Sequence, residues 1–202
     1  MQIEANNYPV AVLGAGTMGE GISQIAASAG HPVMLYDVSQ QQLETALENI
    51  AKRLASSVKK EKITAEKREQ ILGNLIPQKT LGDLSQAKLV IEGIIEDLAI
   101  KQTLFCELES LLAENVILAT NTFSIDLNKM GSVLKRPQHF VGMHFFNPAP
   151  IMALVEIVRS QHTDSSVADT VFKLSEKWSN NPVHVRSSPG FIVNRVARPF
   201  YS

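Results

Sequence analysis

The sequence predicts an α/β fold with a doubly wound, mainly parallel sheet, followed by the start of an all-α domain. Short apolar runs alternate along the chain with segments whose apolar residues recur at helical spacing, which is typical of parallel strands joined by crossover helices. The first run ends in closely spaced glycines, and the sequence stops within an apolar segment, residues 190–201, that indicates a new helix. We therefore expect one domain over residues 1–187 and the start of a truncated C-terminal helical domain over 188–202.

Local patterns predict the individual elements. Strands are expected where a short apolar run is bounded by polar or turn residues, because the strands of a parallel sheet are buried on both faces. Helices are expected where apolar residues recur every three or four positions, with Ser39 and Thr64 as capping residues. The expected strands cover residues 9–13, 32–36, 88–92, 116–120, 139–144, 154–158 and 182–185. The expected helices cover residues 17–29, 40 to about 60, a stretch after 64, 98–112, 125–130 and 165–179.

Composition and charge exclude several classes of protein. The 19 Lys and Arg residues nearly balance 20 Asp and Glu residues, so no bulk charge favours nucleic acid or a membrane surface. No apolar run approaches the ~20 residues of a membrane span, and the N-terminus lacks the basic and apolar parts of a signal peptide. A cytoplasmic location without nucleic-acid or membrane partners is expected by default. The single cysteine, Cys106, has apolar neighbours and is expected to be a core thiol.

A glycine motif, GAGTMG, follows the first predicted strand and opens the first predicted helix. In a Rossmann-type fold the first glycine allows a tight turn, the second lets backbone approach a pyrophosphate, and the third lets the helix pack on the strand. The helix N-terminus adds N–H groups for the phosphates. A tight turn without a ligand is the alternative. The residues expected to bind the cofactor here are Gly14, Gly16, Thr17, Met18 and Gly19.

An acidic residue at the end of the second predicted strand indicates which nucleotide is bound. Asp37 lies 18 residues after Gly19, where a carboxylate accepts hydrogen bonds from the adenosine ribose hydroxyls. The same charge repels a 2′-phosphate, and no arginine follows Asp37 directly. NAD is therefore the expected cofactor rather than NADP. A helix-capping role for Asp37 ahead of Ser39 is the alternative.

A histidine and a glutamate on two later strands form a candidate acid–base pair. His144 precedes a proline-containing loop, and Glu156 lies twelve residues further on. A histidine has a reference pKa of ~6.5, which suits it to moving a proton at neutral pH. A carboxylate on its other ring nitrogen would fix the tautomer and stabilise the cation that forms. From the spacing alone, a structural His–Glu pair remains open.

Several segments together resemble the 3-hydroxyacyl-CoA dehydrogenase family, and the similarity covers about residues 8–201. The HFFNP and PGFIVNR segments are specific to that family, whereas the glycine motif is not. The terminal VARPFYS resembles the bacterial members that act in fatty-acid and phenylacetate breakdown. The matching segments are 14–21 (GAGTMGEG), 91–97 (IEGIIED), 121–122 (NT), 142–150 (GMHFFNPAP), 155–156 (VE) and 189–195 (PGFIVNR).

The resemblance implies a role for individual residues. His144 would be the general base, Glu156 its partner and Asn194 a substrate-contacting residue, while Lys60 would contact the phosphates of CoA. Without the resemblance, Lys60 is better explained as part of a solvated helix face. The positions that match cofactor contacts are Glu96, Lys101 and Asn147.

One position departs from the family pattern. After the Asn-Thr segment the family usually has a serine that touches both substrate and cofactor, but here that residue is Phe123 and Ser124 follows it. Either the loop shifts so that Ser124 supplies the hydroxyl, or the protein does without it. Phe123 at this position therefore leaves open which group polarises the substrate.

The implied activity is the NAD-dependent, reversible oxidation of (3S)-3-hydroxyacyl-CoA to 3-oxoacyl-CoA, without a metal site. The resemblance also implies an acyl-CoA partner and a homodimer formed through the C-terminal domain. Phe191, Ile192, Val196 and Phe200 are expected to lie on a poorly covered face. Two alternatives remain: a non-catalytic NAD-binding structural or sensing relative on the same scaffold, and a β-hydroxyacid dehydrogenase with a lysine as acid–base group.

Overall fold

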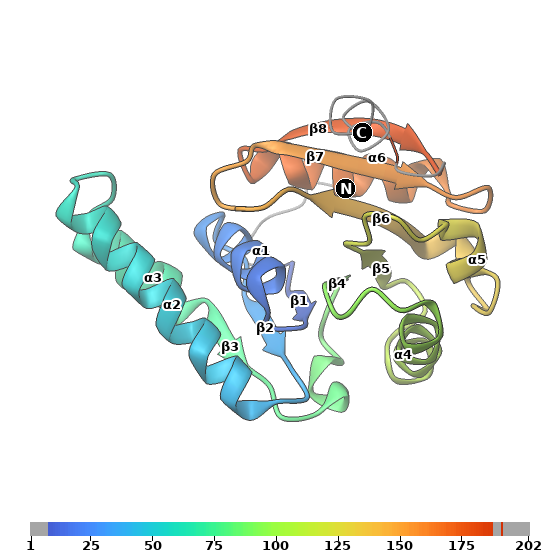
Figure 1. Cartoon of the computed structure of the whole chain (residues 1–202), viewed down its shortest axis with the longest axis horizontal. Coiled ribbons are helices and arrows are strands. Elements are labelled where there is room, and N and C mark those ends of the chain that lie inside the picture. Colours follow the sequence, from blue (N-terminus) through green and yellow to red (C-terminus); the bar gives the residue numbers. More distant parts are fainter. Residues whose placement is uncertain (1–7, 188–190, 192–202) are drawn as a thin grey trace, which may run out of the picture.

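A computed structural model of the chain describes residues 8–187 and 191. Within them helices and strands alternate along the chain, as predicted (Figure 1). The strands are β1 (Val10–Leu13), β2 (Val33–Tyr36), β3 (Leu75–Pro77), β4 (Leu89–Glu92), β5 (Ile117–Thr120), β6 (Phe140–Phe145), β7 (Leu154–Arg159) and β8 (Asn181–Arg186). The α-helices are α1 (Thr17–Ser28), α2 (Gln40–Lys59), α3 (Ala65–Gly73), α4 (Leu98–Leu111), α5 (Leu127–Gly131) and α6 (Ser165–Lys177), with 3₁₀ turns at Leu81–Leu84 and Pro137–His139.

The strands form one eight-stranded sheet in the order β3-β2-β1-β4-β5-β6-β7-β8. Neighbouring strands are parallel throughout, except that β7 runs antiparallel to β6. The chain adds strands outward from β1 in one direction and then, from β4 onward, in the other. This is the doubly wound, Rossmann-type sheet that the sequence predicts, and its strand order reverses between β1 and β4, where such sheets bind ligands.

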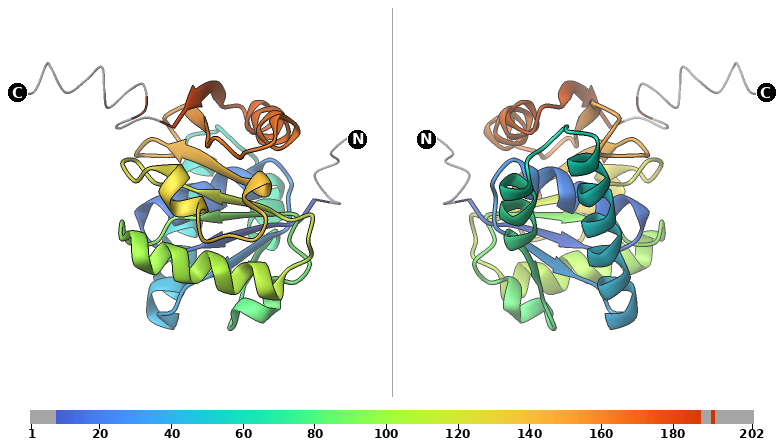
Figure 2. Two further views of the ribbon diagram at one scale, coloured as in Figure 1. Left: turned by 90° about the vertical axis from the view of Figure 1, so that its right-hand side faces the viewer. Right: turned by 90° about the vertical axis from the view of Figure 1, so that its left-hand side faces the viewer.

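Helices cover both faces of the sheet, and alternate residues of each strand pack against them. Val10 and Val12 of β1 belong to a core shared with α1, α2, α3 and α6. Ala11 and Leu13 belong to a second core shared with α4 and α5. Helices α2 and α3 lie side by side and project from the sheet (Figures 1 and 2). Among the described residues, no helix is long and apolar enough to cross a bilayer.

One strand, β3, is not predicted from the sequence; it has three residues and lies at the edge of the sheet. It pairs with β2 from Leu75 to Pro77, but only Leu75 is buried. Ile76 is 41% exposed, and the proline is tolerated because an edge strand has one unpaired side. So short a strand leaves no periodic apolar pattern to detect. The expected helix caps are confirmed: Ser39 Oγ accepts from the Gln42 N–H, and Thr64 Oγ1 accepts from the Lys67 N–H.

The expectation that Cys106 is a core thiol is wrong, because its side chain is exposed. The buried stripe of α4 contains Lys101, Phe105 and Leu108, which follow one another at helical spacing. Residue 106 is turned about 100° around the helix axis from residue 105, so its apolar neighbours face the core and the thiol does not.

The expectation of a poorly covered Phe191 is also wrong. Its ring is 2% exposed and belongs to the core on the α4 and α5 face. The ring centroid lies 5.7 Å from that of His144. Ile192, Val196 and Phe200 lie outside the described residues, as does most of the segment 188–202 assigned to a second domain.

Candidate active site

The glycine loop lies at the carboxyl end of β1, beside the point where the strand order reverses. Gly14 has φ +92°, and a Cβ there would approach Gly93 O to 2.8 Å. A Cβ at Gly19 would lie 1.7 Å from Gly14 O, so both positions exclude any side chain. A Cβ at Gly16 would meet nothing within 4 Å, so packing does not explain this glycine. Gly16 is also the N-cap of α1 and offers no side-chain cap, and this open helix end fits a nucleotide pyrophosphate.

Asp37 follows β2 and ties the glycine loop to the start of α2. Its Oδ2 accepts from the Ala15 N–H at 2.7 Å, and its Oδ1 accepts from the Ser39 N–H at 2.8 Å. The contact with Ser39 matches the capping role that the sequence left open. Each carboxylate oxygen has two lone pairs, so Asp37 also keeps capacity for ribose hydroxyls.

A cavity of about 830 Å³ opens beside Asp37 and is large enough for the adenosine end of a dinucleotide. It is bounded by the ends of β1 and β2, the turn at residues 79–82 and the outer side of α4. Its lining is mainly apolar, and Lys79 and Glu107 are the charged residues that line it besides Asp37. Two predicted cofactor residues, Gly14 and Asp37, line this cavity. The lining residues next to predicted cofactor residues in the sequence are Leu13, Tyr36, Val38 and Ile100.

The structure brings His144 and Glu156 together. They are paired residues of the antiparallel strands β6 and β7, and side chains at such positions project from the same face of a sheet. His144 Nδ1 lies 2.7 Å from Glu156 Oε2, and the two residues are 6% and 0% exposed. The rings of Phe146 and Phe191 lie near the imidazole, with centroid distances of 4.4 and 5.7 Å. An ionised carboxylate only accepts hydrogen bonds, so with Glu156 in that form Nδ1 would be the donor and Nε2 the nitrogen that can accept a proton.

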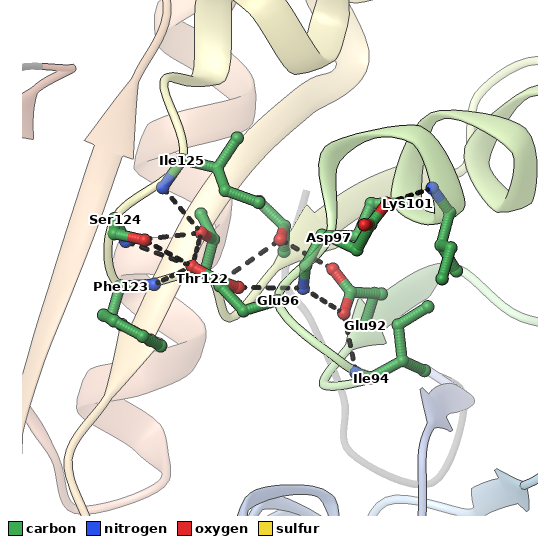
Figure 3. Close-up of polar contacts among 11 residues, drawn as sticks. Glu92, Ile94, Glu96, Asp97, Lys101, Thr122, Phe123, Ser124 and Ile125 are labelled. Carbon is green, nitrogen blue, oxygen red and sulfur yellow. Dashed lines mark hydrogen bonds and ion pairs between the residues drawn. The ribbon is translucent and has the colours of Figure 1, made fainter.

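Glu96 accepts several hydrogen bonds from the loop that follows β5. Its Oε1 accepts from the Thr122 hydroxyl, from the Phe123 N–H at 3.2 Å, and from both the N–H and the hydroxyl of Ser124 at 3.2 and 3.0 Å (Figure 3). Burial acts to raise the pKa of Glu96, but the hydrogen bond from Thr122, the charge of Lys101 and the hydrogen bonds from Ser124 and Phe123 outweigh it and lower the pKa. Glu96 is therefore an anion that fixes the loop carrying Ser124.

Lys101 is held by carboxylates. Its side chain is 1% exposed, and its Nζ lies 2.5 Å from Glu92 Oε1 and 3.4 Å from Glu96 Oε2. Lys101 and Glu96 are predicted site residues, whereas Glu92 and Asn121 are part of matching segments without a predicted role. Asn121 Oδ1 accepts from the N–H of Phe145 at 2.8 Å.

The remaining predicted site residues lie on the surface or outside the described part. Thr17 is exposed at the start of α1, and Met18 is partly buried. Asn147 is exposed and precedes Pro148 through a cis peptide bond. Lys60 is exposed at the end of α2. Asn194 lies outside residues 8–187 and 191, and those residues contain no cluster of potential metal ligands.

Helix α1, which follows the glycine loop, also touches the loop between His144 and Glu156. A Cβ at Gly21 of α1 would lie 3.0 Å from both Ala149 Cβ and Pro150 Cδ. Gly21 thus lets α1 pack closely on the segment that joins β6 to β7. The helix that follows the glycine loop is thus in contact with the loop that follows His144.

A doubly wound sheet with a glycine loop and an acidic residue after β2 defines a dinucleotide-binding domain. The profile of the family described as "3-hydroxyacyl-CoA dehydrogenase, NAD binding domain" matches residues 9–188. The chain therefore belongs to the 3-hydroxyacyl-CoA dehydrogenase family, through its NAD-binding domain.

Curated relatives and solved structures agree with this assignment. The chain is 46% identical, over 98% of its length, to 3-hydroxyadipyl-CoA dehydrogenase of Escherichia coli K12, and 38% identical, over 95%, to the fatty acid oxidation complex subunit alpha of Pseudomonas syringae pv. syringae. It spans 42% and 26% of the length of these two relatives.

Among solved structures, 3-hydroxybutyryl-CoA dehydrogenase of Escherichia coli K12 superposes with a TM-score of 0.95 at 45% identity, over 97% of this chain and 42% of the other. (S)-3-hydroxybutyryl-CoA dehydrogenase of Ralstonia eutropha gives 0.94 at 36% identity, over 96% and 69%.

Proposed function

We propose that the protein containing this chain oxidises (3S)-3-hydroxyacyl-CoA reversibly to 3-oxoacyl-CoA with NAD. The observation that carries the proposal is the buried hydrogen bond between His144 and Glu156, because it leaves an imidazole nitrogen ready to take a proton. A non-catalytic NAD-binding relative has no need for an ionisable pair at these two positions. The HFFNP segment favours the histidine over a lysine as the acid–base group.

In the proposed reaction, His144 takes the proton of the substrate 3-hydroxyl at Nε2. Glu156 holds the ring through Nδ1 and stabilises the imidazolium that forms, as a buried carboxylate does in other His-based sites. NAD, when bound, supplies the acceptor for the hydride that leaves C3. The rings of Phe146 and Phe191 lie beside the imidazole and would limit its contact with water. In the reverse direction His144 returns the proton to the keto oxygen.

The cofactor residues have distinct tasks in this proposal. The backbone at Gly14, Gly16 and Gly19 approaches the pyrophosphate, and Asp37 receives the ribose hydroxyls. Glu96 contacts the nicotinamide end, and Lys101 acts through Glu96, because its Nζ is engaged by carboxylates. The cofactor is also proposed to contact Thr17, Met18 and Asn147.

The substrate side rests more heavily on resemblance. Asn194 would hold the substrate oxygen beside His144, and the exposed Lys60 would meet the phosphates of CoA. The Ser124 hydroxyl donates to Glu96, so Ser124 can accept a hydrogen bond from a ligand but cannot donate to the substrate oxygen without releasing Glu96. We further propose that the whole protein is a homodimer, which light scattering would test.

The decisive experiment is a turnover assay with the full-length protein. NADH consumption with acetoacetyl-CoA is expected to be fast, and His144→Gln is expected to abolish nearly all of it while NADH still binds. Since the relatives' names mention 3-hydroxyadipyl-CoA and 3-hydroxybutyryl-CoA, 3-oxoadipyl-CoA should be assayed in parallel to define the acyl chain. NADH binding without turnover of any 3-oxoacyl-CoA would instead support the non-catalytic alternative.

A further inference from the structure

Glu92 and Lys101 form a buried ion pair for which the proposed chemistry has no direct use. Their side chains are 0% and 1% exposed, and Lys101 Nζ lies 2.5 Å from Glu92 Oε1. Burying two charges costs several kcal/mol of desolvation for each ion, and apolar residues often stabilise a core equally well. A pair retained at the edge of a ligand site therefore calls for an explanation beyond stability.

The Glu92 carboxylate ties three elements together at the carboxyl edge of the sheet. Its Oε1 accepts from the Ile94 N–H at 2.7 Å as well as from Lys101 of α4. Its Oε2 accepts from the Thr120 hydroxyl, at the end of β5, at 2.7 Å. Glu92 thus fixes the turn after β4, the first turns of α4 and the end of β5 relative to one another.

Two routes lead from this pair to Glu96 (Figure 3). On one side, Lys101 Nζ also lies 3.4 Å from Glu96 Oε2. On the other, Thr120 Oγ1 accepts from the Thr122 N–H at 3.2 Å, and the Thr122 hydroxyl donates to Glu96 Oε1. Glu96 Oε2 is therefore held by Lys101, which Glu92 contacts directly, and Glu96 Oε1 is held by Thr122, which Glu92 reaches through Thr120.

The same edge is connected to the acid–base pair. The Asn121 N–H donates to the backbone carbonyl of Glu92 at 2.7 Å, and Asn121 Oδ1 accepts from the N–H of Phe145, the neighbour of His144. The end of β4 is in this way linked by hydrogen bonds to the end of β6. A substitution of Glu92 is expected to affect Glu96 more than His144, because the connection to Glu96 runs through charged side chains.

We propose that Glu92 is a positioning residue, which acts with Lys101 to set the place and charge of Glu96 and of the loop at residues 122–124. The role rests on the proposed function in one respect, namely that Glu96 faces the nicotinamide end of NAD. Glu92 itself touches neither cofactor nor substrate in this scheme. Its effect is exerted through Lys101 and Thr120.

The test compares four variants of the full-length protein, one of which is Glu96→Gln. Glu92→Gln keeps the shape of the side chain but leaves the Lys101 ammonium without its nearest carboxylate. The double variant Glu92→Gln with Lys101→Met removes both charges, so it avoids an unpaired buried ion and should fold even if the single variant does not. Glu109→Gln is the matched control, since Glu109 is also a buried acid of α4 (side chain 4% exposed) but pairs with Arg136, ahead of β6.

NADH affinity, measured by fluorescence titration, is the main readout because it does not require turnover. The double variant is expected to bind NADH about tenfold or more weakly, the effect of losing one charge-assisted contact to Glu96. Its KM for acyl-CoA should stay the same while kcat falls. Glu109→Gln should lower the melting temperature without changing NADH affinity.

Wild-type NADH affinity and kcat in the folded double variant would overturn the proposal and leave the pair with a structural role only. Unchanged NADH affinity in Glu96→Gln would overturn it as well, because the position and charge of Glu96 would then not matter for NADH binding. If the wild-type protein binds NADH but turns over no 3-oxoacyl-CoA, the proposed function fails while the affinity comparison still decides the role of Glu92.

Discussion

Glu156 lies directly across from His144 in the antiparallel pair of β6 and β7, with 2.7 Å between its Oε2 and the imidazole Nδ1. The backbone pairing alone places the two Cβ atoms side by side on one face of the sheet. A loop of eight residues separates the strands, so the sequence spacing of twelve is the spacing of a register pair. The hydrogen bond therefore depends on the one antiparallel step among the described strands.

His144→Gln is expected to reduce kcat by ~10²–10⁴, because the amide cannot take a proton at the position of Nε2. NADH affinity should stay close to wild type, since the glycine loop and Asp37 are untouched. Glu156→Gln should cause a smaller loss, as it removes the orienting charge and keeps the base. Steady-state kinetics with acetoacetyl-CoA and NADH would check both. Nearly full activity of His144→Gln would contradict the proposed mechanism.

Asp37→Ala should weaken NADH binding by more than about tenfold, because a charge-assisted hydrogen bond contributes ~1.5–3 kcal/mol. The same change removes the charge that repels a 2′-phosphate, so the difference between NADH and NADPH should narrow. Titrations of both nucleotides against both proteins would measure this. If the unmodified protein bound the two nucleotides equally, Asp37 would not be the selecting residue.

Gly16 and Gly19 should respond differently to alanine. Gly19→Ala forces a Cβ against the Gly14 carbonyl and is expected to lower the free energy of unfolding by about 3 kcal/mol. Gly16→Ala meets no protein atom, so stability should fall by less than about 1 kcal/mol. Its NADH affinity should nevertheless drop more than about tenfold, as the new methyl occupies the approach of the pyrophosphate. Denaturant unfolding and NADH titration together would separate the two cases, and equal affinity of Gly16→Ala and wild type would refute the phosphate site.

Ser124→Ala should lower kcat more than Phe123→Ala does. The Ser124 hydroxyl donates to Glu96, whereas the Phe123 side chain is 51% exposed and contributes its backbone N–H, which alanine keeps. Steady-state kinetics of the two variants would decide the matter. Small and equal effects would mean that the Ser124 hydroxyl takes no part in the reaction.

The lowered pKa of Glu96 predicts a pH-dependent contribution to stability. A carboxyl whose pKa is lower in the folded protein stabilises it above the ordinary value of 4.5, and this contribution disappears as the pH falls through the folded-state pKa. Glu96→Gln should therefore be less stable than wild type at neutral pH, and the difference should shrink below about pH 4.5. Urea unfolding at a series of pH values would show it. A difference that does not change with pH would mean that Glu96 contributes through its shape alone.

Much of the fold could be predicted because the relevant signals are local. Neighbouring residues determine the helix caps at Ser39 and Thr64, and they also form the apolar runs of the strands. β3 left no such signal because two of its three residues are exposed. Cys106 was misjudged because apolar neighbours in sequence do not say which of them faces the core.

The candidate site could be predicted only in part, for a related reason. The glycines, Asp37, His144 and Glu156 stand in recognisable segments. The role of Glu92 depends on contacts with Lys101, nine residues away, and Thr120, twenty-eight residues away. Only the packing of α4 and β5 beside β4 brings these partners together, and no pattern within one element reveals that.

The close contact of Gly21 with Ala149 and Pro150 has a consequence for redesign of this domain. A common strategy for changing nucleotide preference is to transplant the phosphate-binding segment of another enzyme. Here that segment continues into a helix whose second turn is tightly packed at position 21, where a Cβ would lie 3.0 Å from both loop residues. A graft that brings a larger residue there is expected to displace the β6–β7 loop, which begins two residues after His144, so the helix and this loop are best exchanged together.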